Sequence, residues 1–448
     1  MQKILFIILL LSSTTAFAQK SEKLIIQPNK ILTLEQAINH AINHSPALNI
    51  ERMKLDEAYI QITEKRLEQI PNIFLSSDLR SNLIIPATPV PANVFNTTAQ
   101  EGEITYLKFN TKWNSSAGIN LSYDIFNPES INSIAEQQHQ LKIQEYNTQI
   151  SEEELRESVA LAYAESVIAE EQKQMLESDT TYYAGLLSNA EQLYIKEKIS
   201  LSDKNDANRA YNESIVNYLD AQKITYDRKA ELLYLIGIDI TIENIESLTL
   251  HEDITALLDH MEQKTNNPYI ASDTEELRQQ ELVELANLRV KTASLKYAPT
   301  ISLQGYYGTN FYNNELSLFN NKFWRGNSYI GLSVRVPISQ SFSTSKEVSR
   351  LRLNHLIESE SLRDIRNRQE KKRLNELSLL HVRKENYRLS RENWEMSKQN
   401  SAAIQLQFEK GHIKQIDLLN EKLKIQKSRH KYLQSVYELF NALIMLNN

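Results

Sequence analysis

The same ten-residue pattern occurs twice in this chain: residues 194–203 read YIKEKISLSD, and residues 408–417 read FEKGHIKQID. An aromatic residue, an isoleucine and an aspartate occupy the first, sixth and tenth positions of both blocks. Each block follows a long helical stretch and opens another helix with one apolar face. The pattern therefore predicts a helix–turn–helix in each half of the chain, and it favours an internal duplication.

Two further landmarks repeat in the same order. Residues 70–75 (IPNIFL) parallel residues 298–303 (APTISL), and residues 118–125 (GINLSYDI) parallel residues 331–338 (GLSVRVPI). We therefore expect two repeats, residues 19–236 and 276–448, joined by an equatorial linker region at 237–275. Each repeat should contain a helix, a β-hairpin, a long helix and a return helix.

The predicted long helices are unusual in length. Only nine Gly and ten Pro occur in 448 residues, and none of them lies between 343 and 408. Residues 128–194 and 343–408 therefore predict rods of close to 100 Å each, at a rise of about 1.5 Å per residue. The return helices are expected at 199–236 and 413–446, with Gly237 as a C-cap. Their apolar seams are Ile215, Leu219, Tyr226, Ala230 and Leu233, then Leu433, Val436, Phe440 and Leu443. Such narrow seams predict sideways packing against further copies, or an ordinary extended coiled coil.

The short strands alternate apolar and polar residues, for example at 119–125, 301–304 and 330–339. Alternation gives a strand one apolar and one polar face, which suits either a soluble hairpin core or a membrane strand. Aromatic residues crowd both hairpins, as at a membrane interface. Only four clear strands are found, too few to close a membrane barrel, which needs at least about eight. Residues 86–110 are expected to form a long, extracellular hairpin loop.

The N-terminus predicts export. Lys3, the apolar run from Ile4 to Leu11 and the small residues Ala16 and Ala18 form a signal peptide over residues 1–18. No later stretch has the roughly 20 apolar residues of a membrane-spanning helix. The chain has no cysteine, which excludes disulfides, thiolate metal sites and a lipid-modified cysteine. The net charge of −7 is spread over mixed signs, so no nucleic-acid partner is indicated.

Neither a catalytic nor a cofactor motif is present. His40 and His44 have a metal-compatible i, i+4 spacing, but no third ligand stands at a recognisable spacing, so a surface helix is the better interpretation. We expect no enzyme, no catalytic residues, no cofactor and no metal site.

With these features together, the chain resembles the TolC family of outer-membrane efflux and export proteins. The resemblance rests on residues 32–38 (LTLEQAI), residues 43–48 (NHSPAL) and the two helix–turn blocks. It implies a mixed membrane protein: a homotrimer with a 12-stranded β-barrel, four strands per chain, continuous with a long α-helical barrel. It further implies a passive conduit in the outer membrane of a Gram-negative bacterium. Its partners would be outer-membrane lipid, a periplasmic adaptor and, through the adaptor, an inner-membrane transporter of a tripartite efflux or type I secretion system.

The resemblance also places a periplasmic gate near the second block. Asp417 matches a constriction aspartate, with Phe408 and Asp203 in the paired blocks. Asn420 stands where the family has a second aspartate, and Ile413 stands where it has an arginine that holds the closed tip together. Lys410 or Lys414, which lie close by in the sequence, could take the place of that arginine. Glu197 stands where Gly411 has its counterpart. The plainer interpretation of Asp417 is a solvated or capping aspartate at a helix start.

Two other functions stay open from the sequence alone. A periplasmic adaptor would also have long helices, although usually in one hairpin flanked by β-rich segments. A secreted enzyme would need a site that the sequence does not present. The cargo, the transporter class, the latch contacts of the gate and its resting state are not specified by the sequence.

Overall fold

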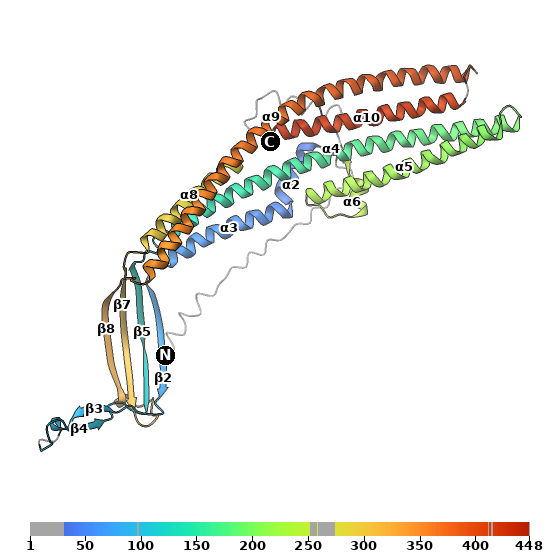
Figure 1. Cartoon of the computed structure of the whole chain (residues 1–448). Coiled ribbons are helices and arrows are strands. Elements are labelled where there is room, and N and C mark those ends of the chain that lie inside the picture. Colours follow the sequence, from blue (N-terminus) through green and yellow to red (C-terminus); the bar gives the residue numbers. More distant parts are fainter. Residues whose placement is uncertain are drawn as a thin grey trace. The chain divides into compact units, whose positions relative to one another are not determined.

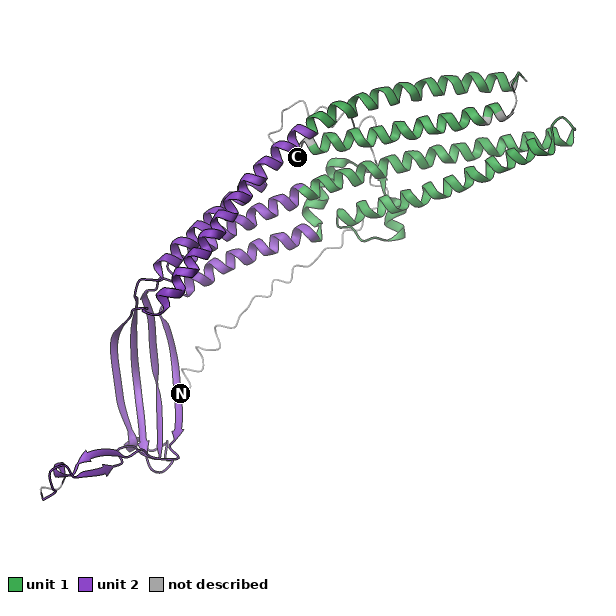
Figure 2. Ribbon diagram, viewed as in Figure 1, with its two compact units in different colours: residues 1–46, 154–269, 376–448 green, residues 47–153, 270–375 purple. Residues whose placement is uncertain are grey.

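The computed structural model describes residues 31–95, 98–250, 258, 274–410, 412–413 and 415–447. The predicted signal peptide lies outside these residues, as do Gly411, Lys414 and much of the predicted linker. The chain forms two compact units (Figure 2). Unit 1 takes its described residues from 1–46, 154–269 and 376–448, and unit 2 from 47–153 and 270–375. Each unit draws on both predicted repeats, whose boundaries stay a prediction.

Unit 2 contains one four-stranded antiparallel sheet in the order β2-β5-β7-β8 (Figure 1). Its strands are β2 (Asn72–Ser81), β5 (Trp113–Phe126), β7 (Thr300–Asn313) and β8 (Trp324–Arg335). The four predicted strands are thereby confirmed. The expected continuation of the last strand to residue 338 is wrong, because β8 ends two residues before Pro337, which has no backbone N–H for the ladder.

The strand register gathers apolar side chains on one face of this sheet. Ile73 lies opposite Leu121, Leu121 opposite Gly305, and Gly305 opposite Ile330. Directly opposed residues share a face, so the apolar set forms one surface. Its large members are Ile73, Leu75, Leu79, Trp113, Ile119, Leu121, Tyr123, Ile301, Leu303, Tyr307, Phe311, Trp324, Ile330, Leu332 and Val334. The described part of the chain leaves much of this surface uncovered, since Leu75 is 78% and Ile330 73% exposed.

The predicted loop at 86–110 is partly wrong, because it contains a small antiparallel hairpin. Its strands are β3 (Thr88–Pro91) and β4 (Ile104–Leu107), with the 3-10 turn η1 (Ala92–Val94) after β3. Two prolines hid β3 from the sequence analysis, since proline removes a ladder donor. An isolated two-stranded ladder has only edge strands, where proline is tolerated.

Helices above the sheet complete unit 2. They are α3 (Pro46–Leu67), α8 (Thr274–Leu295) and the segments within unit 2 of α4 (Ser133–Ile195) and α9 (Gln340–Glu409). Polar contacts join them: His139 Nδ1 lies 2.7 Å from Glu281 Oε1, and Gln279 Nε2 donates to Glu358 Oε2 at 2.7 Å. With 63 and 70 residues, α4 and α9 confirm the two predicted long helices. None of the helices in the described residues combines the length and apolarity needed to cross a membrane.

Unit 1 contains the remaining segments of α4 and α9 and their return helices, which are α5 (Leu201–Leu235) and α10 (Gln415–Asn447). It also contains α2 (Leu34–His44), α6 (Ile242–Ser247) and a parallel pair of short strands, β1 (Ile31–Leu32) and β6 (Thr249–Leu250). The predicted seam of α10 is confirmed, because Leu433, Val436, Phe440 and Leu443 are all at most 3% exposed.

The predicted seam of α5 is wrong in part. Leu219 and Tyr226 are exposed, whereas Ala221 and Thr225 are buried. The Thr225 hydroxyl donates to the Ala169 carbonyl of α4 at 3.1 Å, a contact that small side chains on this stripe permit. Hydrophobicity alone selects the large residues and therefore misplaces the stripe.

The end of α5 meets the end of α2 at Gly237. This residue has φ +77°, and a Cβ atom there would lie 2.5 Å from the His44 carbonyl oxygen. The Ile238 N–H donates to the Leu233 carbonyl at 3.0 Å, which closes the helix as the sequence predicts. His40 Nδ1 lies 2.8 Å from the Ile236 carbonyl oxygen, so His40 is a packing residue at this junction rather than part of a surface helix.

A carboxylate on α4 connects three elements of unit 1. Glu170 forms ion pairs with Lys173 at 2.6 Å and with Lys229 of α5 at 3.0 Å. Lys229 Nζ also donates to the Leu248 carbonyl just after α6, at 3.0 Å. Burial raises the pKa of Glu170, but the two lysines outweigh it and hold the pKa below its ordinary value of 4.5.

We expect Glu170→Gln to lower the free energy of unfolding at pH 7 by about 1–2 kcal/mol. Because the folded pKa is depressed, the stabilisation is complete above about pH 4.5 and is lost as the pH falls through the folded pKa. Urea midpoints by circular dichroism between pH 3 and pH 7 would therefore fall less steeply with acid in the variant. Glu231→Gln, at an exposed position of α5, is the control, and equal acid slopes in wild type and Glu170→Gln would contradict the assignment.

Candidate functional site

The predicted gate lies at the two turns between the long helices and their return helices, all within unit 1. The turn between α4 and α5 has two hydrogen bonds: Lys198 N–H donates to the Leu193 carbonyl and Glu197 N–H to the Tyr194 carbonyl, each at 2.9 Å. This pair of bonds is a Schellman C-cap, whose turning residue adopts the left-handed conformation. Glu197 is that residue, with φ 56°, and is the only non-glycine residue with positive φ in the described part of the chain.

The turn between α9 and α10 repeats the longer of these bonds. The His412 N–H donates to the Gln407 carbonyl at 2.9 Å, the same five-residue separation as between Lys198 and Leu193. The alignment of the two blocks proposed from the sequence, with Glu197 as the counterpart of Gly411, therefore agrees with the hydrogen bonds at equivalent positions of the two turns. Lys410 follows the end of α9, and its N–H donates to the Leu406 carbonyl at 3.2 Å.

The structure separates the predicted gate residues into two groups. Asp417 and Asn420 are exposed at the start of α10, while Leu418 between them is 1% exposed. Leu418 packs in a cluster with Tyr183 and Leu186 of α4, and Phe408 packs against the same cluster. Phe408 is thus a packing residue at the tip, whereas Asp417 and Asn420 lie on the accessible side of α10. Ile413 is half-buried in the turn.

Asp203 caps a helix. The Ser200 N–H and hydroxyl both donate to Asp203 Oδ2, at 3.0 and 2.7 Å, and the Asp203 N–H donates to Ser200 Oγ at 3.1 Å. This reciprocal pair is a capping box, which satisfies donors at the N-terminus of α5. Helix capping, the plainer interpretation offered for Asp417, is therefore what Asp203 does at the equivalent position of the first half.

Behind the tip, a carboxylate of α4 faces two polar side chains of α10. Asp179 Oδ2 accepts from Gln426 Nε2 at 3.1 Å and lies 3.8 Å from Arg429 NH1. Lys422 Nζ sits 4.1 Å from the centre of the Tyr182 ring, a cation–π contact. Burial and the negative charge of Asp179 raise the pKa of Tyr183 to about 12, and burial lowers the pKa of Lys422 despite Asp179.

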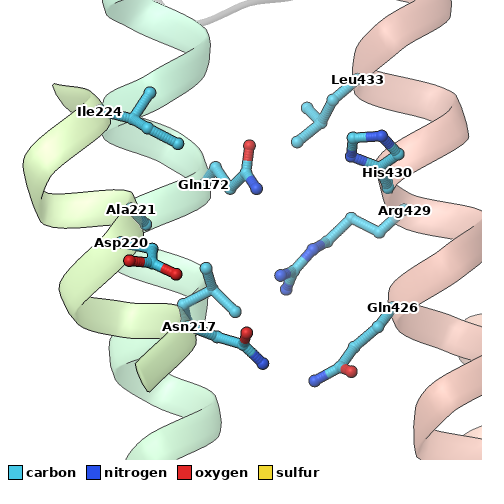
Figure 3. Close-up of a pocket in the computed structure, with 10 residues that line it drawn as sticks. Gln172, Asn217, Asp220, Ala221, Ile224, Gln426, Arg429, His430 and Leu433 are labelled. Carbon is cyan, nitrogen blue, oxygen red and sulfur yellow. The ribbon is translucent and has the colours of Figure 1, made fainter. Parts of the chain in front are cut away.

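Two of these residues, Gln426 and Arg429, also line a groove of about 230 Å³ between α4, α5 and α10 (Figure 3). Figure 3 shows Arg429 extending from α10 toward α5, with Asn217 opposite Gln426. Sequence analysis missed this groove. A signal was available, because continuing the seam of α10 backwards from Leu433 by four residues reaches Arg429, a cation at an apolar position.

The arrangement has no recognisable catalytic chemistry. Within the described ranges, no three His, Cys, Asp or Glu side chains come together as a metal site requires. The groove is lined by amides, apolar side chains, the Arg429 guanidinium, the Asp220 carboxylate and the His430 imidazole, and its lining includes no Ser, Thr or Cys that could act as a nucleophile. What the site offers is two helical turns with exposed carboxylate and amide side chains.

Comparisons with known proteins agree on one architecture. Residues 37–238 match the model of the family described as outer membrane efflux protein. A membrane protein from Pseudomonas aeruginosa has a similar fold, with a TM-score of 0.72 at 12% identity over 92% of each chain. The CmeC outer membrane channel of Campylobacter jejuni gives 0.72 at 14% identity over 92% of this chain and 84% of its own. The outer membrane protein VceC of Vibrio cholerae gives 0.69 at 16% identity over 93% and 96%. A comparison with curated protein sequences gave no match.

Replacing Glu197 with Gly should stabilise the turn between α4 and α5. A side chain in the left-handed region costs roughly 1 kcal/mol or more, whereas glycine adopts it freely. Glycine also adds entropy to the unfolded chain, which offsets part of this effect. We therefore expect the free energy of unfolding, measured by chemical denaturation, to rise by up to about 1 kcal/mol.

The neighbouring Lys198→Gly is the matched control, since it adds the same chain entropy without relieving strain. It should lower stability by about 0.5–1 kcal/mol. A loss of stability in both variants would argue against strain at Glu197.

Proposed function

We propose that this chain, which belongs to the outer membrane efflux protein family, is the outer-membrane channel of a tripartite efflux or type I secretion system. It forms a homotrimer and acts as a passive conduit from the periplasm to the exterior. A periplasmic adaptor joins it to an inner-membrane transporter, and the gate lies at the turns around residues 197 and 413.

The observation that carries this proposal is the sheet of unit 2. Its apolar face is largely exposed, and its outer strands, β2 and β8, each pair with one neighbour among the described residues. Exposed strand edges and a broad apolar surface are costly in water. Three copies, each giving four strands, would close a twelve-stranded barrel, with lipid on the apolar face and water on the polar one.

The helical part supports a conduit rather than an adaptor. An adaptor usually has one long helical hairpin, whereas this chain has two, α4 with α5 and α9 with α10. The exposed Asp417 in the first turn of α10 would stand three times around the axis of a trimer. Such a ring of carboxylates attracts cations and favours opening through mutual repulsion.

The assembly can be tested in membranes. The full-length protein should fractionate with the outer membrane and run as a trimer that changes mobility only on heating, as closed barrels do. Chemical crosslinking before extraction gives an independent readout of three copies. Recovery as a soluble periplasmic monomer would reject the proposal and favour the adaptor function.

The gate can be tested on trimers in planar bilayers. Asp417→Ala should reduce cation selectivity and the block of the current by divalent or trivalent cations, because the carboxylate ring is lost. Asp227→Ala, which removes an exposed carboxylate later in α5, should leave both unchanged. If block and selectivity are the same in Asp417→Ala and wild type, Asp417 does not belong to the constriction.

A further inference from the structure

Three aromatic side chains lie in one row across the polar face of the sheet. Phe74 of β2 is opposite Asn120 of β5, Asn120 is opposite Tyr306 of β7, and Tyr306 is opposite Tyr329 of β8. Opposed residues share a face, so the row runs over all four strands. Where the register is regular, the rest of this face is Ser, Thr, Asn, Gln, Gly, Asp and Arg, apart from Tyr312 near the far end of β7.

Two glycines in the next row make space for the central ring. Gly118 and Gly308 are opposed to each other, and a Cβ atom on Gly118 would lie 2.7 Å from the Tyr306 ring. A Cβ atom on Gly308 would lie 2.6 Å from the Tyr306 hydroxyl oxygen. Tyr306 therefore lies along the sheet, over bare backbone. Tyr329 stacks beside it, with ring centres 6.0 Å apart and planes 25° from parallel.

The other two rings of the row are open to solvent in the chain. Phe74 is 47% and Tyr329 58% exposed. The rows on either side contribute Ser76 and Asn327, then Ser122, Gln304 and Gly331, none of which carries a charge. The charged residues of this face, such as Asp78 and Arg325, lie at least two rows away. The row is thus an uncharged aromatic band on a surface that is otherwise hydrophilic.

We propose that this row, repeated in three copies, forms an aromatic collar in the channel that binds planar aromatic solutes by stacking. The inference rests on the channel function proposed above, in which the polar face lines the lumen. With strands 4.8 Å apart and tilted by roughly 40°, the row climbs about 9 Å across the four strands of each copy. Threefold symmetry then places three identical aromatic steps at one level.

Planar aromatic solutes fit this band better than sugars or ions do. Stacking on an aromatic face needs only ring area, which Phe74 and Tyr329 present. A sugar would need several directional hydrogen-bond partners, and the row offers only two tyrosine hydroxyls and the Asn120 amide, which already donates to Ser76 at 2.7 Å. A site for ions would need charges, and these lie away from the band.

Single-trimer recordings in planar bilayers can test the collar with two cations of equal charge. Rhodamine 6G has a planar ring system, and tetrapropylammonium has none, so voltage drives both into the pore while only one can stack. We expect longer blocking events with rhodamine 6G in the wild type. Phe74→Leu and Tyr329→Leu, which keep apolar bulk but remove a ring, should each shorten these events roughly tenfold.

Tyr307→Leu is the matched control, because Tyr307 neighbours Tyr306 in sequence but lies on the apolar face and is 76% exposed. It should leave the rhodamine 6G events unchanged, and no variant should alter those of tetrapropylammonium. Equal event lengths for the two probes in the wild type, or unchanged events in both Phe74→Leu and Tyr329→Leu, would overturn the collar.

Two outcomes separate this inference from the channel itself. Trimers that conduct but fail the probe comparison would reject only the collar, whereas a protein that forms no trimer in the outer-membrane fraction would reject the proposed function. If Tyr329→Leu does not assemble, Phe74→Leu decides the question alone, since Phe74 has no counterpart of the Tyr306–Tyr329 stack.

Discussion

The backbone of a β-strand must find partners for its N–H and C=O groups, and this requirement governs the molecule. In the four-stranded sheet, backbone N–H and C=O groups are paired only between neighbouring strands, so the outer sides of β2 and β8 have no strand partner among the described residues. The same strands present a wide apolar face. One chain cannot satisfy the edges and the face together, because curling four strands into a closed cylinder leaves no room for side chains. In the proposed assembly, association with identical copies in a lipid environment would satisfy both.

The helices meet a related constraint in a different way. In α5 the buried stripe consists of small residues such as Ala221 and Thr225 until it reaches Leu232 and Leu233 near the end of the helix, and larger apolar residues such as Leu219 remain exposed. In α10 the stripe is large and apolar at one end and becomes polar at Arg429 and Gln426. The half-buried Arg429 guanidinium near Asp179 contributes less to stability than a leucine would, because its desolvation offsets much of the attraction.

Much of this could be read from the sequence, and the failures have physical causes. Long helices and alternating strands were predictable because their periodicity is local, and the duplicated blocks identified both turns. The resemblance to the efflux family is likewise confirmed. The α5 stripe was misplaced because burial there follows helix proximity rather than side-chain size. The groove at Arg429 and the row at Tyr306 depend on contacts between segments far apart in sequence. Asp203 stays a predicted gate residue, and its side chain also caps a helix, since both roles use an aspartate at a helix start.

The predicted duplication would also explain how three copies could join without a new kind of contact. The strands β2 and β5 come from the first predicted repeat, and β7 and β8 from the second. The two repeats meet where β5 pairs with β7, the second strand of one hairpin beside the first strand of the next. If β8 paired with β2 of a neighbouring copy, the contact would be of the same kind. It would again be antiparallel and would join the second strand of one hairpin to the first strand of another. The chain thus contains one example of the contact that closes the proposed barrel. A sequence able to form that junction within a chain already has much of what it needs to form it between chains.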